Sequence, residues 1–405
     1  GDDPVEHGAV AGALMPHTLI IVENLPVPFD RRVWQEATAL REAGHEVTVI
    51  CPKAKGQVKS REVLDGIRIY RHWLPEAEGV KGYLIEYPVA LIMQTLLSFL
   101  VRLRHGAIHT IQGCSPPDLI WMVALLHRPF GTRYVFDHHD LSPELYETKF
   151  ARRDAFYRLL LWAERMTFRL ARTSIATNET FKAIAVERGR MDPDDVFVVK
   201  SYPRIERFRR TDPHPDITAL DKTIIGYIGI MGAQDGVDMM IDALAEARGR
   251  GREDLHGLII GDGPEFETLK AHARARGVEG AITFTGYQSG EALMAYLSAI
   301  DVGVIPDPPD PFNSKLSMNK VFEYMMLSLP FAMFDLTQAR SEAQEAALVV
   351  AEHSAAALAD GILALADDPA RRAEMGRIGR AEAEKSFRWE NEVEALLAAH
   401  ARART

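Results

Sequence analysis

Residues 18–51, TLIIVENLPVPFDRRVWQEATALREAGHEVTVIC, contain a strand, a helix and a second strand. The continuous apolar run at 18–22 predicts a buried strand of a parallel sheet. Residues 31–43 have the apolar periodicity of a helix, and Asp30 is placed to cap its first turn. A second strand is expected at 46–51. Because two parallel strands joined by a helix are the unit of α/β folds, this segment predicts an α/β protein.

The same alternation continues along the chain with one interruption. Residues 202–222 contain three prolines among many charges, which predicts a linker between two domains. Further strands are expected at 67–71, 107–111, 133–137, 173–177, 196–200, 223–229, 256–261, 281–285, 301–305, 330–335 and 348–351. Further helices are expected at 85–104, 116–127, 152–171, 179–189, 236–249, 264–277, 289–298, 318–327, 340–346, 354–366, 368–385 and 387–402.

This pattern predicts two Rossmann-like doubly wound domains that face a cleft, at residues 1–203 and 204–386. In open sheets of this kind, ligands bind outside the carboxyl ends of the strands, so the cleft is the expected active site.

The composition excludes several classes of protein. The 405 residues carry a net charge of −10, whereas a nucleic-acid-binding protein is normally basic. Two cysteines, Cys51 and Cys114, imply no disulfide framework and fit a reducing compartment, and neither lies in a pattern of zinc-ligand spacing. The acidic start GDDPVEHG predicts no signal peptide. We therefore expect a cytoplasmic protein that binds no nucleic acid.

Residues 313–328, NSKLSMNKVFEYMMLS, run from a polar loop into a helix. The N-terminus of a helix offers unpaired N–H groups and a partial positive charge, to which Lys320 adds a full charge. This combination predicts a site for a phosphate or diphosphate. The alternative is an ordinary capped helix after the proline-rich turn at 307–311.

Two arginines at the start of the first helix, Arg31 and Arg32, oppose the usual dipole preference, since cations suit the opposite end. Anion binding in the cleft explains them, and Arg31 is the stronger candidate. The alternative is that they point to solvent or pair with Glu36 and Glu42.

Residues 137–145, DHHDLSPEL, follow a strand where a catalytic loop is expected. His139 is a candidate acid, base or hydrogen-bonding group, because imidazole changes charge near neutral pH. A metal site with His138 is a weaker alternative, since adjacent side chains usually point apart. A structural histidine is the other alternative.

Glycine loops follow strands of the second domain. They permit close approach of the backbone to a ligand, although each is weak evidence by itself. The candidates are Gly229, Gly232 and Gly236 in YIGIMGAQDG, Gly261 in GDGP, and Gly286 with Tyr287 in FTGY, which is placed to read a nucleobase.

The chain resembles the retaining glycosyltransferases of family four, which have the two-domain GT-B fold. The resemblance covers nearly the whole chain and rests on these blocks: PFDRRVWQEATALREAGHEVTVICP, FDHHDLSPELY, YIGIMGAQDGVD, GDGPEFETL, FTGY, SMNKVFEYMMLSLPFAMFD and RRAEMGRIGRAEAEKSFRWE. It implies transfer of a sugar from a nucleotide-sugar donor to a glycan, glycolipid or other acceptor, with retention of the anomeric configuration. It also implies that the last helix, within 387–405, packs back on the first domain.

The resemblance assigns roles to residues. Glu323 is expected to hold the ribose hydroxyls, Gly286 and Tyr287 to lie near the base, and His139 to lie near the donor sugar. The phosphates or the sugar are expected to meet Ser317, Met318, Asn319 and Lys320. Members usually need no metal for the diphosphate, so no cofactor is expected. The setting implied is polysaccharide or glycolipid synthesis.

The chain departs from the family pattern at several of these positions. Ile230 and Asp235 stand where Arg and Lys are common, and Lys315 stands where the first Glu of a Glu–seven residues–Glu pattern is usual. A subgroup with NKxxEYM-type motifs shares such changes. We therefore expect a rearranged phosphate clamp made by Lys320 and Arg31, with Lys315 next.

The sequence leaves two alternative functions open, and it also leaves open whether the protein contacts a membrane. A sugar-nucleotide epimerase shares the architecture, and a catalytically silent sugar-nucleotide-binding scaffold would also fit the departures. The helix at 85–104 is expected to be buried or interfacial rather than membrane-spanning. With a run of basic residues at 149–172 it predicts possible peripheral contact with an anionic membrane, whose alternative is a solvated helix face beside a buried helix.

Overall fold

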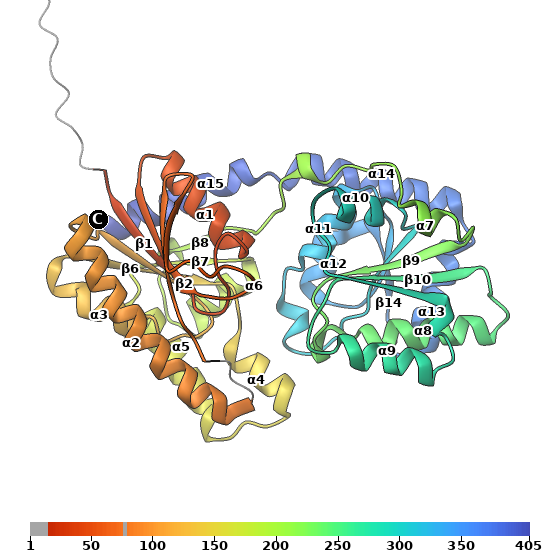
Figure 1. Ribbon diagram of the computed structural model, residues 1–405, viewed down its shortest axis with the longest axis horizontal. Coiled ribbons are helices and arrows are strands. Elements are labelled where there is room, and N and C mark those ends of the chain that lie inside the picture. The colour runs from red at the N-terminus through yellow and green to blue at the C-terminus, as the bar shows by residue number, and fades with distance from the viewer. Residues whose placement is uncertain (1–14, 76–78) are drawn as a thin grey trace, which may run out of the picture.

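The computed structural model describes residues 15–75 and 79–405, which form two α/β domains, each built on one sheet (Figure 1). The predicted fold class is confirmed. In each sheet the first strand of the domain, β1 (His17–Ile21) or β9 (Thr223–Ile228), has later strands of the same domain on both sides. The strand order therefore reverses there, which places the topological switch point beside β1 in one domain and beside β9 in the other.

The N-terminal sheet has the order β3-β4-β2-β1-β5-β6-β7-β8, with parallel pairing throughout except between β3 and β4. Its strands are β1 (His17–Ile21), β2 (Glu46–Pro52), β3 (Arg61–Leu64), β4 (Ile67–His72), β5 (Thr110–Cys114), β6 (Arg133–His138), β7 (Thr173–Ala176) and β8 (Val196–Val198). Its helices are α1 (Arg31–Glu42), α2 (Gly79–His105), α3 (Trp121–His127), α4 (Ser142–Phe150), α5 (Ala155–Leu170) and α6 (Glu179–Glu187).

The C-terminal sheet has the parallel order β11-β10-β9-β12-β13-β14. Its strands are β9 (Thr223–Ile228), β10 (Leu255–Ile260), β11 (Ile282–Gly286), β12 (Val302–Ile305), β13 (Phe331–Phe334) and β14 (Ala347–Val350). Its helices are α7 (Pro215–Thr218), α8 (Val237–Gly249), α9 (Phe266–Ala275), α10 (Gly290–Ser298), α11 (Asn319–Met326), α12 (Thr337–Ala343), α13 (Ala355–Ala366) and α14 (Pro369–Ser386).

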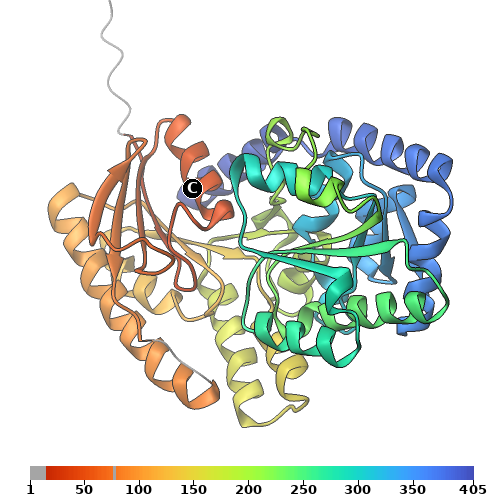
Figure 2. The same ribbon diagram turned by 45° about the vertical axis from the view of Figure 1, so that its right-hand side comes forward.

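The last helix, α15 (Trp389–Arg404), returns to the N-terminal sheet. Trp389, Leu396 and Ala399 are buried in the same cluster as Ile20 and Val49 of that sheet. Helix α14 packs instead on α11 of the C-terminal domain. Both views therefore show the two helices joining one domain to the other along one side of the molecule (Figures 1 and 2).

Several details differ from the sequence prediction; for example, the strand expected at 107–111 is β5 at Thr110–Cys114. The edge strand β3 and the helix α4 were not predicted. The expected linker at 202–222 is instead part of the C-terminal domain, because Tyr202, Phe208 and Ile217 are buried in its core. The many prolines and charged residues of this segment are typical of a linker, but its three apolar side chains are enough to pack it against the C-terminal domain.

Helix α2 is unusually exposed for its composition. The segment Ile85–His105 has a mean hydropathy of 1.3 and is long and apolar enough to cross a membrane by these two criteria, with 22% of it buried. Ala90, Gln94, Ser98 and Val101 form its buried stripe. The opposite side of this helix is an apolar surface.

Candidate functional site

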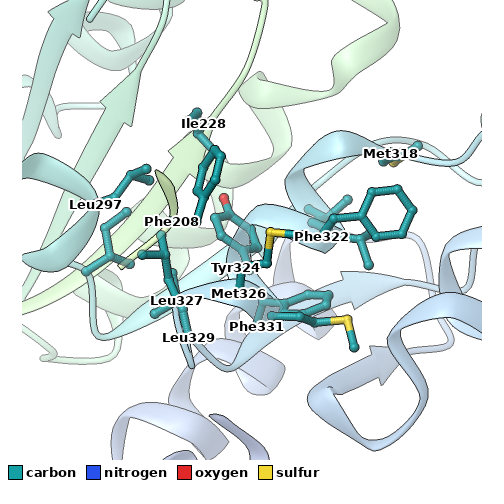
Figure 3. Packing of buried hydrophobic residues seen from close by; sticks show 14 of the residues in the cluster. Phe208, Ile228, Leu297, Met318, Phe322, Tyr324, Met326, Leu327, Leu329 and Phe331 are labelled. Carbon is teal, nitrogen blue, oxygen red and sulfur yellow. The ribbon is translucent and has the colours of Figure 1, made fainter. Parts of the chain in front are cut away.

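Helix α11 presents an uncapped first turn to the interface between the domains. Met318 precedes it in extended backbone, and no side chain of the described residues caps the turn. Asn319 at the start is exposed, whereas Phe322, Tyr324 and Met326 are buried in the core that Figure 3 shows. The helix is therefore held firmly while its first amide groups and the positive end of its dipole stay available, as a phosphate site requires.

Lys320, predicted to add charge at this helix end, is already paired with carboxylates. Its Nζ lies 2.7 and 2.9 Å from the two oxygens of Asp307 and 3.9 Å from Asp235. The side chains of Lys320 and Asp307 are only 10% and 3% exposed. Burial raises the pKa of Asp235 to about 6 and also raises that of Asp307, although Lys320 opposes both changes. Much of the charge of Lys320 is thus offset before any ligand binds.

Arg31 and Glu323 come from opposite domains and contact each other. The Nη1 of Arg31, at the start of α1, donates to Oε1 of Glu323 at 3.2 Å. Arg31 is 60% exposed and Glu323 only 6%. Burial raises the pKa of Glu323, and Arg31 acts against that rise. Because the Arg31 side chain is largely exposed, it can turn from this carboxylate to another anion, provided that the buried Glu323 then gains another hydrogen-bond partner.

Side chains of the N-terminal domain hold the loop that leads into α11. The Nζ of Lys315 lies 2.9 Å from Oε1 of Glu144 on α4. Asn178, which caps α6, donates to the carbonyl oxygen of Lys315 at 3.0 Å and to the hydroxyl of Ser317 at 3.1 Å. Ser317 donates in turn to Glu342 at 2.6 Å. Lys315 and Ser317 therefore join the two domains.

The predicted glycine loops pack against each other at the ends of β9 and β10. Gly229 and Gly232 follow β9, and Gly236 begins α8. A side chain at Gly261, where φ is +135°, would collide with the carbonyl oxygen of Gly229, and one at Gly236 would collide with that of Pro306. These glycines have a packing reason, and their contact with a ligand stays a prediction.

Tyr287 follows Gly286 at the end of β11 and is 59% exposed. Its ring lies 6.1 Å from that of Phe29, which belongs to the loop after β1 in the other domain. Aromatic faces from both domains thus meet beside the interface, where a planar base can stack.

The two neighbouring histidines after β6 have different environments. The Nδ1 of His139 lies 3.0 Å from Oδ2 of Asp137. Burial disfavours the charged ring, but the Asp137 carboxylate outweighs it and raises the pKa of His139. His138 instead packs among the rings of Phe136 and Phe181, and burial lowers its pKa to about 3. The structural alternative therefore applies to His138, and His139 stays the candidate for chemistry.

Arg32 is a buried structural cation rather than a free anion-binding group. It is 8% exposed, with Nη2 2.7 Å from Asp137 and 3.0 Å from Glu36. The sequence analysis offered pairing of Arg32 with Glu36 as an alternative to anion binding, but it did not predict the ion pair with Asp137. The available signal was a carboxylate at a strand end, two residues before His139.

In residues 15–75 and 79–405 no group of three or more His, Cys, Asp or Glu side chains is arranged to hold a metal ion.

Both domains match known protein families. Residues 30–201 match the family described as "Glycosyl transferase 4-like domain", and residues 222–368 match "Glycosyl transferases group 1". The chain spans about half the length of the curated relatives that it matches. It is 26% identical over 223 residues to alpha-D-kanosaminyltransferase of Streptomyces kanamyceticus, a match that covers 53% of this chain and 56% of the relative.

Solved structures share the fold over nearly the whole chain. Sucrose-phosphate synthase of Thermosynechococcus elongatus has a TM-score of 0.74 and 19% identity, covering 94% of this chain and 96% of that one. HepE of Anabaena, solved with UDP and glucose, has a TM-score of 0.70 and 14% identity, covering 95% and 99%. The architecture is the two-domain GT-B fold. With both domains matched, the chain belongs to the GT-B glycosyltransferases.

Proposed function

We propose that the protein transfers a sugar from a nucleotide-sugar donor to a glycan, glycolipid or other hydroxyl-bearing acceptor, with retention of the anomeric configuration. The observation that carries this proposal is the meeting of Arg31, Glu323 and the uncapped start of α11 between the domains. The motif at 319–325, NKVFEYM, supports membership of the NKxxEYM-type subgroup.

The donor occupies this meeting point in the proposed complex. Glu323 accepts hydrogen bonds from the ribose hydroxyls, and Arg31 turns from Glu323 to the diphosphate. The first amides of α11 face the phosphates, because a helix N-terminus favours anions. Tyr287 and Gly286 lie beside the base. Donor binding thus replaces one contact between the domains by contacts from both domains to one ligand.

Transfer breaks the bond from the anomeric carbon to the diphosphate and forms a bond from that carbon to the acceptor oxygen. For retention, the acceptor attacks from the face that the diphosphate leaves, and a leaving phosphate oxygen takes the acceptor proton. His139 hydrogen-bonds the sugar beside this point. Preorganised donors such as Arg31 and the α11 amides stabilise the departing charge, each contributing about 10²–10³ in rate. The proposal needs no metal or cofactor.

A donor screen followed by product analysis tests this function. HepE was solved with UDP and glucose, so UDP-sugars are the first donors to try in thermal shifts. Released nucleotide with a new glycosidic bond supports a transferase, and the configuration of that bond tests retention. An isomerised nucleotide sugar indicates the epimerase, and binding without turnover indicates the silent scaffold. No affinity for any sugar nucleotide would refute all three.

A second proposal is peripheral contact with the cytoplasmic face of an anionic membrane. Helices α2, α3 and α5 pack side by side in the N-terminal domain (Figure 1). Their exposed apolar side chains are Ile92, Leu96, Leu103, Leu126, Leu159 and Trp162. On α5 these alternate with exposed Arg158, Arg165 and Arg169. Apolar side chains beside cations suit the interface of an anionic bilayer.

Vesicle co-sedimentation tests the membrane proposal. We expect binding to vesicles containing anionic lipid at low salt and less binding at high salt. Reversing the three α5 arginines to glutamate should abolish it. A charge-matched control reverses Arg274, Arg276 and Arg377, exposed residues of the C-terminal domain. Equal loss in both triples, or no binding at low salt, would refute the proposed surface.

A further inference from the structure

Asp137 connects His139 to the segment where the chain crosses between the domains. Its side chain is fully buried at the end of β6, with Oδ2 3.0 Å from His139 Nδ1. The same carboxylate accepts from Arg32 at 2.7 Å. Arg32 also donates to the carbonyl oxygen of Val199 at 2.9 Å and to the hydroxyl of Ser201 at 2.6 Å. One guanidinium therefore joins the loop that carries His139 to the crossing segment.

The contact with Asp137 determines which ring nitrogen of His139 carries the proton. An ionised carboxylate only accepts hydrogen bonds, so Nδ1 donates, and Nε2 keeps its lone pair while the ring is neutral. None of the described side chains hydrogen-bonds Nε2, which leaves it for a ligand. The hydroxyl of Ser115 accepts the backbone N–H groups of His139 and Asp140 at 3.0 Å each, which also fixes the backbone of the loop.

The charges around Arg32 show that Asp137 does more than neutralise a buried cation. A second carboxyl group, that of Glu36, already lies 3.0 Å from Arg32. Burial raises the pKa of Glu36, so this group readily takes a proton. Burial also opposes the charge of Asp137, but Arg32 and His139 hold its pKa well below the usual range. Asp137 is therefore the carboxylate that keeps its charge beside the histidine.

We propose that Asp137 is a positioning residue: it holds the His139 ring with Nδ1 protonated and Nε2 free for the donor sugar, and Arg32 ties this arrangement to the crossing at 199–201. The inference rests on the proposed function only for the part that His139 plays in transfer.

The wild-type protein provides the first test, which needs no substrate. Nitrogen-15 NMR of the histidine rings identifies the tautomer, and the His139 signals are assigned by their loss in His139→Gln. We expect the Nδ1–H form at high pH and a titration midpoint above that of an unperturbed histidine, about 6.5. An Nε2–H tautomer, or a midpoint below that value, would overturn the proposal even if the protein is a transferase.

Matched variants provide the second test. In Asp137→Asn we expect kcat for donor turnover to fall about 10²-fold, the effect of misplacing a positioned group, with a smaller change in KM. The pH–rate midpoint assigned to His139 should shift downward. Glu36→Gln replaces a carboxyl on the same arginine and should leave that midpoint unchanged. Equal effects in both variants, or an unchanged pH profile in Asp137→Asn, would overturn the proposal. If neither wild-type protein nor variants turn over any donor, the transferase fails, and the tautomer alone decides the role of Asp137.

Discussion

Replacing Lys320 by methionine can separate a role in binding phosphate from a role in pairing Asp307. In the wild-type protein these groups lie 2.7 Å apart and are nearly buried. Removing one partner of a buried ion pair costs about 3–5 kcal/mol, because the other charge is left without compensation. A domain of roughly 150–250 residues loses about 2–4 °C of Tm per kcal/mol, so we expect Lys320→Met to lower Tm by about 6–20 °C.

The loss should depend on pH in a defined direction. Burial raises the pKa of Asp307, and Lys320 limits that rise. Without Lys320 the folded-state pKa rises further above the unfolded value, so the folded variant takes up a proton that the unfolded chain has released. The destabilisation should therefore be largest at pH values above the raised folded-state pKa and shrink as the pH falls below it. Denaturant unfolding at pH 5 and pH 8 measures this difference.

The double variant Lys320→Met/Asp307→Asn decides the functional question. It removes both charges and should recover most of the lost stability. If Lys320 acts on the diphosphate, turnover should stay lower by about 10²–10³, the effect of losing one preorganised donor. Donor turnover and thermal unfolding are measured on the same samples. Recovery of wild-type turnover in the double variant would refute the phosphate-clamp assignment and leave Lys320 with a structural role.

Three further sets of variants test other parts of the protein. Arg31→Ala leaves the nearly buried Glu323 without its partner, so it should lower stability as well as donor turnover; unchanged turnover would remove Arg31 from the site. Asn178→Ala removes both the cap of α6 and the hydrogen bonds to the other domain, whereas Asn178→Asp keeps the cap acceptor. The unfolding free energy of Asn178→Ala should therefore be lower than that of Asn178→Asp by about 1–2 kcal/mol, and equal unfolding curves would contradict a capping role for Asn178. Burial raises the pKa of Glu23 from 4.5 to about 8, so the unfolding free energy should fall across this window by up to about 1.4 kcal/mol per pH unit. Denaturant titrations should show that Glu23→Gln removes this slope, and an equal slope in both proteins would contradict the buried carboxyl.

Strands such as β1, HTLII, and β10, LHGLII, were predictable because each contains a continuous apolar run. Strand β5, TIQGC, is equally buried but lacks such a run, and it was expected three residues too early, at 107–111. Strand β3 was missed because charged and apolar residues alternate in Arg61–Leu64, and Val63 is 64% exposed at the sheet edge. Helix α4 was missed because it starts at Ser142 with proline at its first turn, directly after the candidate catalytic residues. Both elements lack the pattern that a core imposes, so only the tertiary structure identifies them.

For the site, the sequence located candidate groups but not their partners. The ends of strands and the starts of helices can be placed along the chain from its sequence pattern. These positions predicted that Arg31, Glu323 and His139 face the same cleft between the domains. The pairing of Arg31 with Glu323 spans 292 residues, and that of Arg32 with Asp137 spans 105. Such contacts depend on how the domains and loops approach each other, and no local pattern encodes them.

The three cations proposed to bind the diphosphate all have carboxylate partners in the structure. Lys320 pairs with Asp307, Lys315 with Glu144, and Arg31 with Glu323. A diphosphate therefore cannot simply add to free positive charge; it must compete with a carboxylate at each position. The competition is easiest at Arg31, which is the most exposed of the three cations. At Arg31 this competition is also coupled to binding of the ribose, because the ribose hydroxyls hydrogen-bond Glu323, the partner of Arg31, in the proposed complex. In the proposed complex, binding of the nucleoside would thus release Arg31 for the leaving diphosphate, and recognition of the donor would be coupled to stabilisation of its leaving group.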